Sequence, residues 1–377
     1  MAESRSALQR DLLAAIWSWP ATPWPPGRFE ELAARLYAFQ LAHIPAYGQW
    51  AARRLGGAPP ANWWQIPLVP VSAFKVAPLA TAAAQAHPAV RFETSGTTDG
   101  QPGQVVLRDT ALYDASLQRA FAHWMVPEAT AAEHRPFRCI SLIPSASVRP
   151  RSSLGFMVRR LAQRWDDGGG TQHLGLAGQE EALDTQGFIE ACQRAVSDQV
   201  PALLFATSVA LQLLLDQLPV DWQVQLPAGS RLMDTGGPKG RRTLVSRDDQ
   251  HRQLQRHLGL APELIVGELG MTELCGQRYE PCARQFLLGL DPGPRAYQAP
   301  PWLAARITRV QDGGPCLAGE VGLVGHVDLS NLDTCAFLQT ADLGALDEQG
   351  ALTLHGRLPG SAWRGCGLDA EELIGPR

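Results

Sequence analysis

The stretch that decides the fold reads Arg91-Phe92-Glu93-Thr94-Ser95-Gly96-Thr97-Thr98-Asp99-Gly100-Gln101-Pro102-Gly103-Gln104. The apolar segment at 90–92 predicts the end of a strand, and the loop after it is rich in hydroxyl side chains and glycines. Because glycine permits positive φ and close approach, such a loop can offer several N–H and hydroxyl groups to one anion. It is not a Walker loop, since no Gly-Lys-Ser/Thr ends it. The stretch predicts a polyphosphate site, with a polar surface turn as the alternative.

The composition is that of a globular enzyme. The chain has 377 residues, of which 45% are hydrophobic and 19% charged, enough for a large core and two subdomains. A net charge of −4 and the lack of a basic run argue against nucleic-acid binding. We see neither a signal peptide nor an apolar run long enough for a membrane span. The 7 scattered cysteines are typical of reduced thiols, so we expect a cytoplasmic protein with every cysteine except Cys366 in the core.

Short apolar runs alternate with helical patterns over the first 300 residues. Residues 1–60 are predicted to be helical, with one apolar stripe along 28–55. Strands are expected at 139–143, 202–206, 226–233 and 264–266, and helices at 110–124, 153–165, 180–197, 208–218 and 242–258. This alternation predicts an α/β layered fold, in which ligands bind at the carboxyl ends of the strands.

The pattern changes after residue 301. Apolar runs at 304–310, 321–327 and 352–355 alternate with Gly, Asp and Asn turns, which is typical of a small antiparallel unit. We therefore expect an α/β core at 1–300, a small β-rich subdomain at 301–357 and a short C-terminal tail at 358–377 that carries Cys366.

Three further polar segments lie later in the chain. They read Asp234-Thr235-Gly236-Gly237-Pro238-Lys239-Gly240, Gly270-Met271-Thr272-Glu273 and Thr340-Ala341-Asp342-Leu343-Gly344, the last followed by Gly356-Arg357. A carboxylate such as Glu273 can hold Mg²⁺, which prefers oxygen ligands and usually arrives with phosphate. Asp342 can accept hydrogen bonds from both hydroxyls of a ribose, with Arg357 beside it. Together with the hydroxyl loop, these parts indicate a nucleotide site.

The order and separations of these segments resemble the core motifs of the adenylate-forming superfamily. Within it, the chain most resembles the acyl-protein synthetases, the LuxE-type long-chain-fatty-acid–protein ligases. The resemblance rests on the segment 67–75 before the hydroxyl loop, on Gly-Gly-Pro-Lys at 236–239 where Gly-Gly-Glu is usual, and on the length of the chain. It implies the α/β layered N-terminal domain of an adenylate-forming enzyme, a small β-rich subdomain and a truncated mobile C-terminal domain.

The resemblance also implies ATP and Mg²⁺ as cofactors and a carboxylic acid, of the fatty acid class, activated as acyl-AMP. It implies that Thr272 contacts the α-phosphate, Glu273 binds Mg²⁺, and Asp342 with Arg357 binds the ribose. Lys239 is expected to contact a phosphate or a carboxylate. The resemblance further implies that the β- and γ-phosphates are contacted by Ser95, Gly96, Thr97 and Thr98. It implies that adenine is contacted by Gly236 and Gly237.

Two departures from the superfamily pattern decide the expected transfer step. No lysine follows Lys239, so the catalytic lysine of the usual mobile domain is absent, and Leu358-Pro359 follows Gly-Arg where the hinge usually has Asp. Separately, the usual lysine of the hydroxyl loop is replaced by Gln101 or Gln104, which removes a positive charge from the phosphate loop. The LuxE-type family offers instead a cysteine near the C-terminus that takes the acyl group, and Arg364-Gly365-Cys366-Gly367-Leu368 matches that pattern. Cys366 would then pass the acyl group to a partner, an acyl reductase or an acyl-carrier protein.

Two alternatives stay open. The first is an acyl- or aryl-CoA or carrier-protein ligase of the phenylacetate–CoA ligase type, in which no enzyme cysteine is acylated. The second is a catalytically reduced nucleotide-binding scaffold subunit, which the absent lysine would explain. Neither the acid nor its chain length can be inferred from the sequence.

Overall fold

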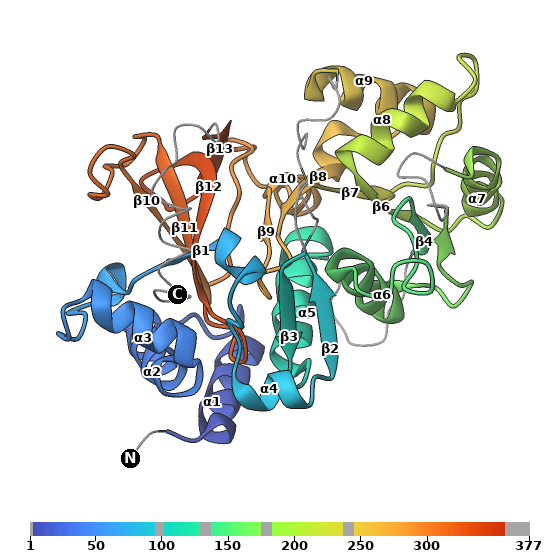
Figure 1. Cartoon of the computed structure of the whole chain (residues 1–377). Helices are drawn as coiled ribbons and strands as arrows, with labels where there is room; N and C mark the ends of the chain where they lie inside the picture. Colours follow the sequence, from blue (N-terminus) through green and yellow to red (C-terminus); the bar gives the residue numbers. More distant parts are fainter. Residues whose placement is uncertain (1–2, 95–101, 129–136, 175–182, 237–244, 359–377) are drawn as a thin grey trace. The chain divides into compact units, whose positions relative to one another are not determined.

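The computed structural model describes residues 3–94, 102–128, 137–174, 183–236 and 245–358. These residues form two compact units (Figure 1). Unit 1 takes its described residues from Met1–Ala120, Met271–Gln277 and Gln298–Arg377, and unit 2 from Phe121–Gly270 and Arg278–Tyr297. This division does not follow the expected boundary at residue 300, because the N-terminal segments pair with strands of the C-terminal part of the chain.

Unit 2 is built on a six-stranded sheet in the order β5-β4-β6-β7-β8-β9. Neighbouring strands are parallel except for β8 and β9, which are antiparallel. Parallel strands buried on both faces are apolar throughout, which is why the sequence predicted them as short apolar runs. The strands are β4 (Arg138–Ser141), β5 (Gln172–His173), β6 (Ala202–Thr207), β7 (Arg231–Thr235), β8 (Ile265–Leu269) and β9 (Arg278–Tyr279).

Four helices of unit 2 begin at side-chain caps. Ser152, Asp184, Thr207 and Ser246 each accept a hydrogen bond from a backbone N–H in the first turn of the following helix. The elements are α6 (Ser153–Trp165), α7 (Thr185–Ser197), α8 (Ser208–Gln217), α9 (Arg247–Leu258), α10 (Cys282–Leu287) and the 3₁₀ turn η3 (Pro262–Leu264). The helices predicted at 153–165 and 208–218 are confirmed, and α7 and α9 lie within the predicted ranges.

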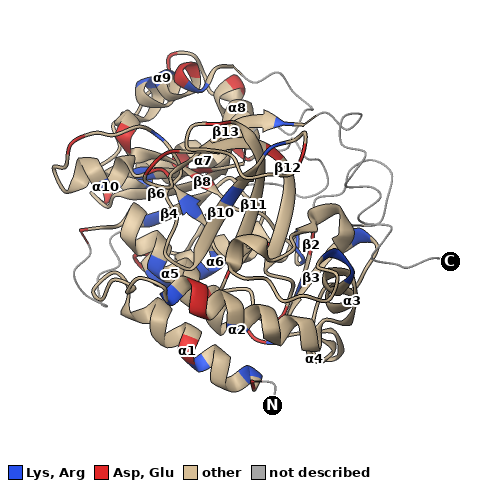
Figure 2. Cartoon of the chain, turned by 90° about the vertical axis from the view of Figure 1, so that its left-hand side faces the viewer, with Lys and Arg blue, Asp and Glu red and all other residues tan. Residues whose placement is uncertain are grey.

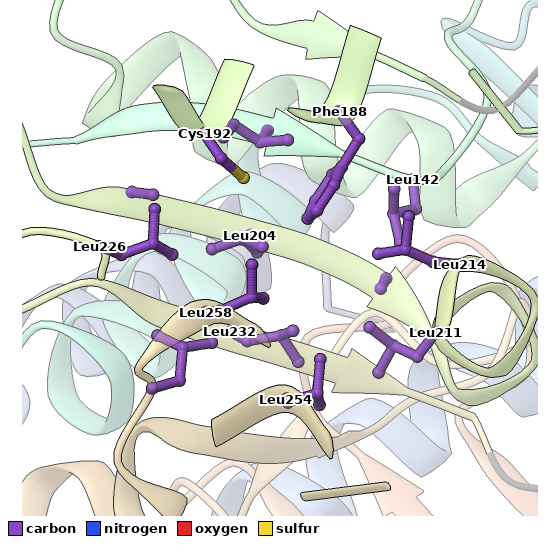
Figure 3. Packing of buried hydrophobic residues seen from close by; sticks show 14 of the residues in the cluster. Leu142, Phe188, Cys192, Leu204, Leu211, Leu214, Leu226, Leu232, Leu254 and Leu258 are labelled. Atoms are coloured by element: carbon purple, nitrogen blue, oxygen red, sulfur yellow. The ribbon is translucent and has the colours of Figure 1, made fainter. Parts of the chain in front are cut away.

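The core of unit 2 lies between the sheet and helices α7, α8 and α9. Leu204 of β6 and Leu232 of β7 belong to one buried cluster with Phe188, Leu211 and Leu254 of the three helices (Figure 3). Because alternate residues of a strand face opposite sides, the next residue of β6 points to the other face, where Phe205 and Phe121 have ring centroids 6.3 Å apart. With apolar side chains packed on both faces, polar groups gather at the strand ends.

Unit 1 is built on a five-stranded sheet with β12 at its centre. One edge of β12 pairs with β11, which pairs onward with β10, and the other edge pairs with β1 and β13. Only β1 runs parallel to β12. The strands are β1 (Val69–Pro70), β10 (Leu303–Thr308), β11 (Gly322–Asp328), β12 (Phe337–Leu346) and β13 (Leu352–Arg357).

A two-stranded hairpin and several helices complete unit 1. In the hairpin, β2 (Val90–Glu93) pairs antiparallel with β3 (Gln104–Leu107). Pro45, at the first position of a helix, splits the apolar stripe predicted along 28–55 into two helices, because proline has no N–H to continue the first. The elements are α1 (Arg5–Ser18), α2 (Arg28–His43), α3 (Pro45–Arg54), α4 (Ala82–Ala86), η1 (Trp63–Gln65) and η2 (Val71–Lys75), while α5 (Ala111–Met125) contributes to both units.

The structure corrects the bounds of two predicted strands and adds five that were not predicted. The strand predicted at 226–233 begins only at Arg231, because Ser230 N–H donates to Pro227 O at 3.1 Å in a turn. The strand predicted at 264–266 starts one residue later and continues to Leu269, so Glu268 lies inside β8 rather than in a loop. The strands β1, β3, β5, β9 and β12 were not predicted, and β12 contains the motif around Asp342.

Charges of both signs lie side by side on the elements of both units. Helix α9, for example, carries Asp248 and Asp249 in its first turn and Arg256 in its last, which suits the helix dipole (Figure 2). No helix among the described residues is long and apolar enough to cross a membrane.

Candidate functional site

The hydroxyl loop starts and ends on a closed hairpin in unit 1. Thr94 N–H donates to Gly103 O at 2.9 Å, and Gly103 N–H donates to Thr94 Oγ1 at 2.9 Å. A Cβ at Gly103 would lie 3.1 Å from both Thr94 Oγ1 and Phe74 Cβ, so this close approach favours glycine. The predicted phosphate contacts lie outside the described residues and stay a prediction for Ser95, Gly96, Thr97 and Thr98.

The predicted ribose residues lie side by side in unit 1. Asp342 of β12 and Arg357 of β13 are cross-strand partners, and Arg357 Nε donates to Asp342 Oδ1 at 2.6 Å. The Arg357 side chain is 66% exposed and that of Asp342 27% exposed. Since an exposed pair of this kind contributes only about 0–1 kcal/mol to stability, both side chains are free to exchange their contact for a ligand.

Thr272 and Glu273 form the centre of a turn in unit 1. Leu274 N–H donates to Met271 O at 3.1 Å and closes the turn. Glu273 is buried, and its backbone oxygen accepts a hydrogen bond from Asn331 Nδ2 at 3.0 Å. The turn therefore places a hydroxyl and a carboxylate next to each other on a braced backbone.

A single carboxylate such as Glu273 would suit a magnesium ion that arrives with a nucleotide. Within the ranges that the structure describes, no three His, Cys, Asp or Glu side chains gather to hold a metal. Mg²⁺ is commonly bound by one or two carboxylates, while substrate phosphates and water complete its shell. A single carboxylate such as Glu273 suits that arrangement, whereas a permanent cage of protein ligands would need more.

Unit 2 gathers polar groups where β6 and β7 end. Ser208 Oγ, at the start of α8, lies 2.8 Å from Asp234 Oδ1 and 2.5 Å from Gly236 O. Gly236, predicted to contact adenine, has φ +80°, a conformation that other residues adopt only with strain. The Ser208 hydroxyl thus lies within hydrogen-bond distance of both the carboxyl group at the end of β7 and the turn after it. Gly237 and Lys239 lie outside the described residues.

Glu268 is a buried carboxyl group at the carboxyl end of β8. It is 2% exposed and lies beside Thr235, whose hydroxyl donates to Glu268 Oε2. Its other oxygen, Oε1, has no hydrogen-bond partner among the described residues. Burial raises the pKa of Glu268 to about 7 against the Thr235 hydrogen bond, and the charge of Asp234 adds to the rise. A half-satisfied buried group at this edge of a parallel sheet is a candidate for ligand contact.

The neighbouring carboxyl groups of unit 2 divide into two kinds. Burial raises the pKa of Asp234 to about 6, opposed by the Ser208 hydrogen bond. Burial acts to raise the pKa of Glu280 as well, but the hydrogen bonds and charge of Arg247 outweigh it and hold that pKa below its ordinary value. Arg247 donates to both oxygens of Glu280 at 2.5 and 2.7 Å, and Arg295 donates at 2.8 Å. Glu280 is therefore a fixed anion, whereas Asp234 and Glu268 can change charge near neutral pH.

The cysteines that the structure describes are free thiols. Burial raises the pKa of Cys192 to about 12 and that of Cys282 to about 11, which makes both poor nucleophiles. Cys316 is only partly buried, which corrects the expectation that all six of these cysteines lie in the core. Cys366 lies outside the described residues, so its role stays a prediction.

Sequence reasoning missed four polar residues near these groups. They are Ser208, Glu268, Asp328 and Asn331. A signal was available for Glu268, which is the only charged residue in the otherwise apolar run Ile265 to Leu269. The other three are ordinary polar residues, and the contacts that tie them to this region reach partners 26 to 58 positions away, which no local pattern marks.

Comparison with protein-family models and with curated proteins finds no match. Among solved structures, the chain is similar to the ATP-bound RpMatB-BxBclM chimera B3, with 18% identity and a TM-score of 0.50. It is also similar to ATP-bound MatB from Rhodopseudomonas palustris, with 18% identity and a TM-score of 0.48. Both alignments cover 72% of this chain and 48% of the other. A third, the long-chain-fatty-acid-CoA ligase FadD1 from Archaeoglobus fulgidus, has 15% identity and a TM-score of 0.49, covering 74% and 53%.

At this identity the likeness concerns the fold. The solved structures are those of adenylate-forming enzymes, and the present chain spans about half of their length. The expected fold class is thus confirmed: the described residues have the α/β fold of the N-terminal domain of adenylate-forming enzymes.

Proposed function

We propose that the protein activates a carboxylic acid with ATP and Mg²⁺, forming an acyl adenylate and pyrophosphate. The observation that carries the proposal is the pair of Asp342 and Arg357, whose side chains meet at 2.6 Å on neighbouring strands, so one ribose could contact both. The fold likeness to an ATP-bound chimera over 72% of the chain supports the choice of nucleotide.

In the proposed first step, a carboxylate oxygen of the acid attacks the α-phosphorus of ATP. The bond from that phosphorus to the bridging oxygen breaks, and pyrophosphate leaves with the electron pair. Thr272 holds the α-phosphate, and Glu273 holds Mg²⁺, which when bound neutralises charge on the phosphates. Groups fixed in place before the reaction stabilise developing charge without having to reorganise.

The remaining nucleotide contacts come from the two Gly-rich segments. Gly236 and Gly237 flank the adenine, and Lys239 contacts a phosphate or the acid. The hydroxyl loop, with Ser95, Gly96, Thr97 and Thr98, holds the β- and γ-phosphates above the closed base formed by Thr94 and Gly103.

In the proposed second step, the thiolate of Cys366 attacks the acyl carbon, AMP leaves with its oxygen, and a thioester forms. The raised pKa values of the buried cysteines support a nucleophile elsewhere in the chain. The thioester then passes to a partner, an acyl reductase or an acyl-carrier protein. A fatty acid is the substrate class that the resemblance to acyl-protein synthetases favours.

Acid-dependent ATP–pyrophosphate exchange tests the first step. We expect exchange in the wild type with at least one member of a panel of fatty and aryl acids. Glu273→Ala should lower it by about 100-fold or more, because the metal would lose its protein ligand. Glu190→Ala, which changes an exposed glutamate of α7, should leave it unchanged. Full exchange in Glu273→Ala would refute the assignment of Glu273.

Covalent labelling by radiolabelled acid tests the second step. Cys366→Ser should keep the exchange reaction but lose the label, while Cys316→Ser, at the partly buried cysteine, should keep both. Labelling that persists in Cys366→Ser would exclude this residue as acyl carrier. Consumption of free CoA without any label would favour a CoA ligase, and ATP binding without acyl-AMP would favour a scaffold.

A further inference from the structure

A buried carboxylate braces the segment that follows Glu273. Asp328, the last residue of β11, is 0% exposed. Its Oδ2 accepts hydrogen bonds from the N–H groups of Cys275 at 2.7 Å and Gly276 at 2.8 Å. Its Oδ1 accepts from the N–H of Ser330 at 3.0 Å and from the hydroxyl of Ser330 at 2.5 Å. Both oxygens therefore accept hydrogen bonds, one from the segment after Glu273 and the other from the turn after β11.

A second buried side chain of that turn reaches Glu273 itself. Asn331 is 0% exposed, and its Nδ2 donates to Glu273 O at 3.0 Å. Its Oδ1 accepts from Thr334 N–H at 3.3 Å, which ties the amide group to its own turn. Asp328 and Asn331 together fix the backbone at Glu273, Cys275 and Gly276.

A residue of helix α2 forms hydrogen bonds to the turn after β11. Gln40 is 0% exposed, and its Nε2 donates to Asn331 O at 2.9 Å and to Thr334 O at 2.8 Å. Its Oε1 accepts from Ala336 N–H at 3.0 Å. A buried polar network with its partners in place is rigid, and a rigid frame is what a ligand-binding turn needs.

We propose that Asp328 and Asn331 are positioning residues that set the Thr272–Glu273 turn for MgATP. The inference rests on the proposed function, since it assigns them to the turn that would hold the α-phosphate and the metal. Burying a carboxylate and an amide is costly for folding, and an apolar pair could fill the same space. Their hydrogen bonds converge on one backbone segment, the one that carries Glu273. Groups that hydrogen-bond to a metal ligand and fix its orientation typically contribute 10–100-fold to the affinity for the metal.

Titration calorimetry with MgATP, and with ATP in the absence of metal, tests the inference on wild type, Asp328→Asn and Asn331→Ala. We expect the Kd for MgATP to rise about 10–100-fold in both variants, and the Kd for metal-free ATP to change much less. Asp333→Asn is the matched control. Asp333 lies in the same turn and is equally buried, but its carboxylate accepts from Arg5 and from Arg108 N–H instead.

Each outcome separates the inference from the function on which it rests. Wild type that binds no MgATP refutes the proposed function. Wild type that binds MgATP, with variants that bind it equally well, overturns the inference alone. An equal loss in Asp333→Asn also overturns it, because the effect would then be a general loss of turn stability. Asn331→Ala removes a neutral side chain and keeps the test available if Asp328→Asn does not fold.

Discussion

Two buried carboxyl groups, Asp328 in unit 1 and Glu268 in unit 2, differ in how many hydrogen bonds they accept. Both are almost fully buried, at 0% and 2% exposure, and burial raises the pKa of each. Asp328 accepts four hydrogen bonds across its two oxygens. Glu268 accepts one, from Thr235, and leaves Oε1 without a partner in the described part of the chain.

The difference separates a structural role from a role toward a ligand. A buried acid with both oxygens bonded has hydrogen bonds that offset part of the cost of its burial, and it holds backbone in place. A buried acid with one oxygen unused carries a cost that nothing in the described residues offsets, and such groups concentrate at functional sites. We therefore assign Asp328 to positioning, and Glu268 stays a candidate for ligand contact because its Oε1 has no hydrogen-bond partner among the described residues.

The largest effect on stability should come from Asp328→Asn. An amide has one acceptor oxygen, so the variant leaves two of the four donors around residue 328 facing an NH₂ group. Each buried donor left unsatisfied costs about 1–3 kcal/mol, and we expect a loss of about 4 kcal/mol in the free energy of unfolding. Urea unfolding followed by circular dichroism measures it, and a loss below about 1 kcal/mol would contradict the bracing role.

Glu268→Gln should change the free energy of unfolding by an amount that varies with pH by about 3 kcal/mol. The pKa of Glu268 is about 7 in the folded protein and near its ordinary 4.5 when unfolded. The folded state therefore holds more protons between these values, and wild-type stability falls as the pH rises from 4.5 to above 7. The variant cannot ionise, so its stability relative to wild type should rise by about 3 kcal/mol between pH 4 and pH 8.

Unfolding titrations of both proteins at a series of pH values give this difference. Glu190→Gln, at an exposed site of α7, serves as control and should show no such trend. A stability difference between wild type and Glu268→Gln that does not change with pH would mean that folding does not raise the pKa of Glu268.

Arg357→Ala should have the smallest effect on stability, below about 1 kcal/mol, because its pair with Asp342 is exposed. If the pair binds ribose, the Kd for ATP should nevertheless rise about tenfold or more, since the charged hydrogen bond is lost. Arg309→Ala is a matched control, as Arg309 forms an exposed pair with Asp312 at 3.0 Å. Unchanged ATP binding in Arg357→Ala would remove the pair from the site.

The sequence predicted well what local patterns determine. Helices such as α6 and α8 follow from their apolar period and from capping residues such as Ser152 and Thr207. The pairing of Asp342 with Arg357 was within reach too, because only one antiparallel connection separates β12 from β13. The hydroxyl loop was predicted from its glycines, but the β3 side of its hairpin was not.

Long-range contacts explain what the sequence could not predict. Two of the four hydrogen bonds of Asp328, those from Cys275 and Gly276, join positions more than 50 residues apart, and no spacing rule marks them. The strand β12 was missed because its motif around Asp342 is polar, and its extended form depends on three neighbouring strands. Glu268 was placed in a loop for the same reason: β8 continues past its apolar residues through pairing with β7 and β9.

The most direct measurement of the central claim is the identity of the nucleotide product. Wild-type protein would be incubated with ATP, Mg²⁺ and a panel of fatty and aryl acids, and the quenched mixture analysed by mass spectrometry. The account predicts acyl-AMP together with pyrophosphate, in amounts that depend on the acid and fall in Glu273→Ala. Formation of ADP and phosphate, or no acid-dependent turnover of ATP with any acid, would contradict it.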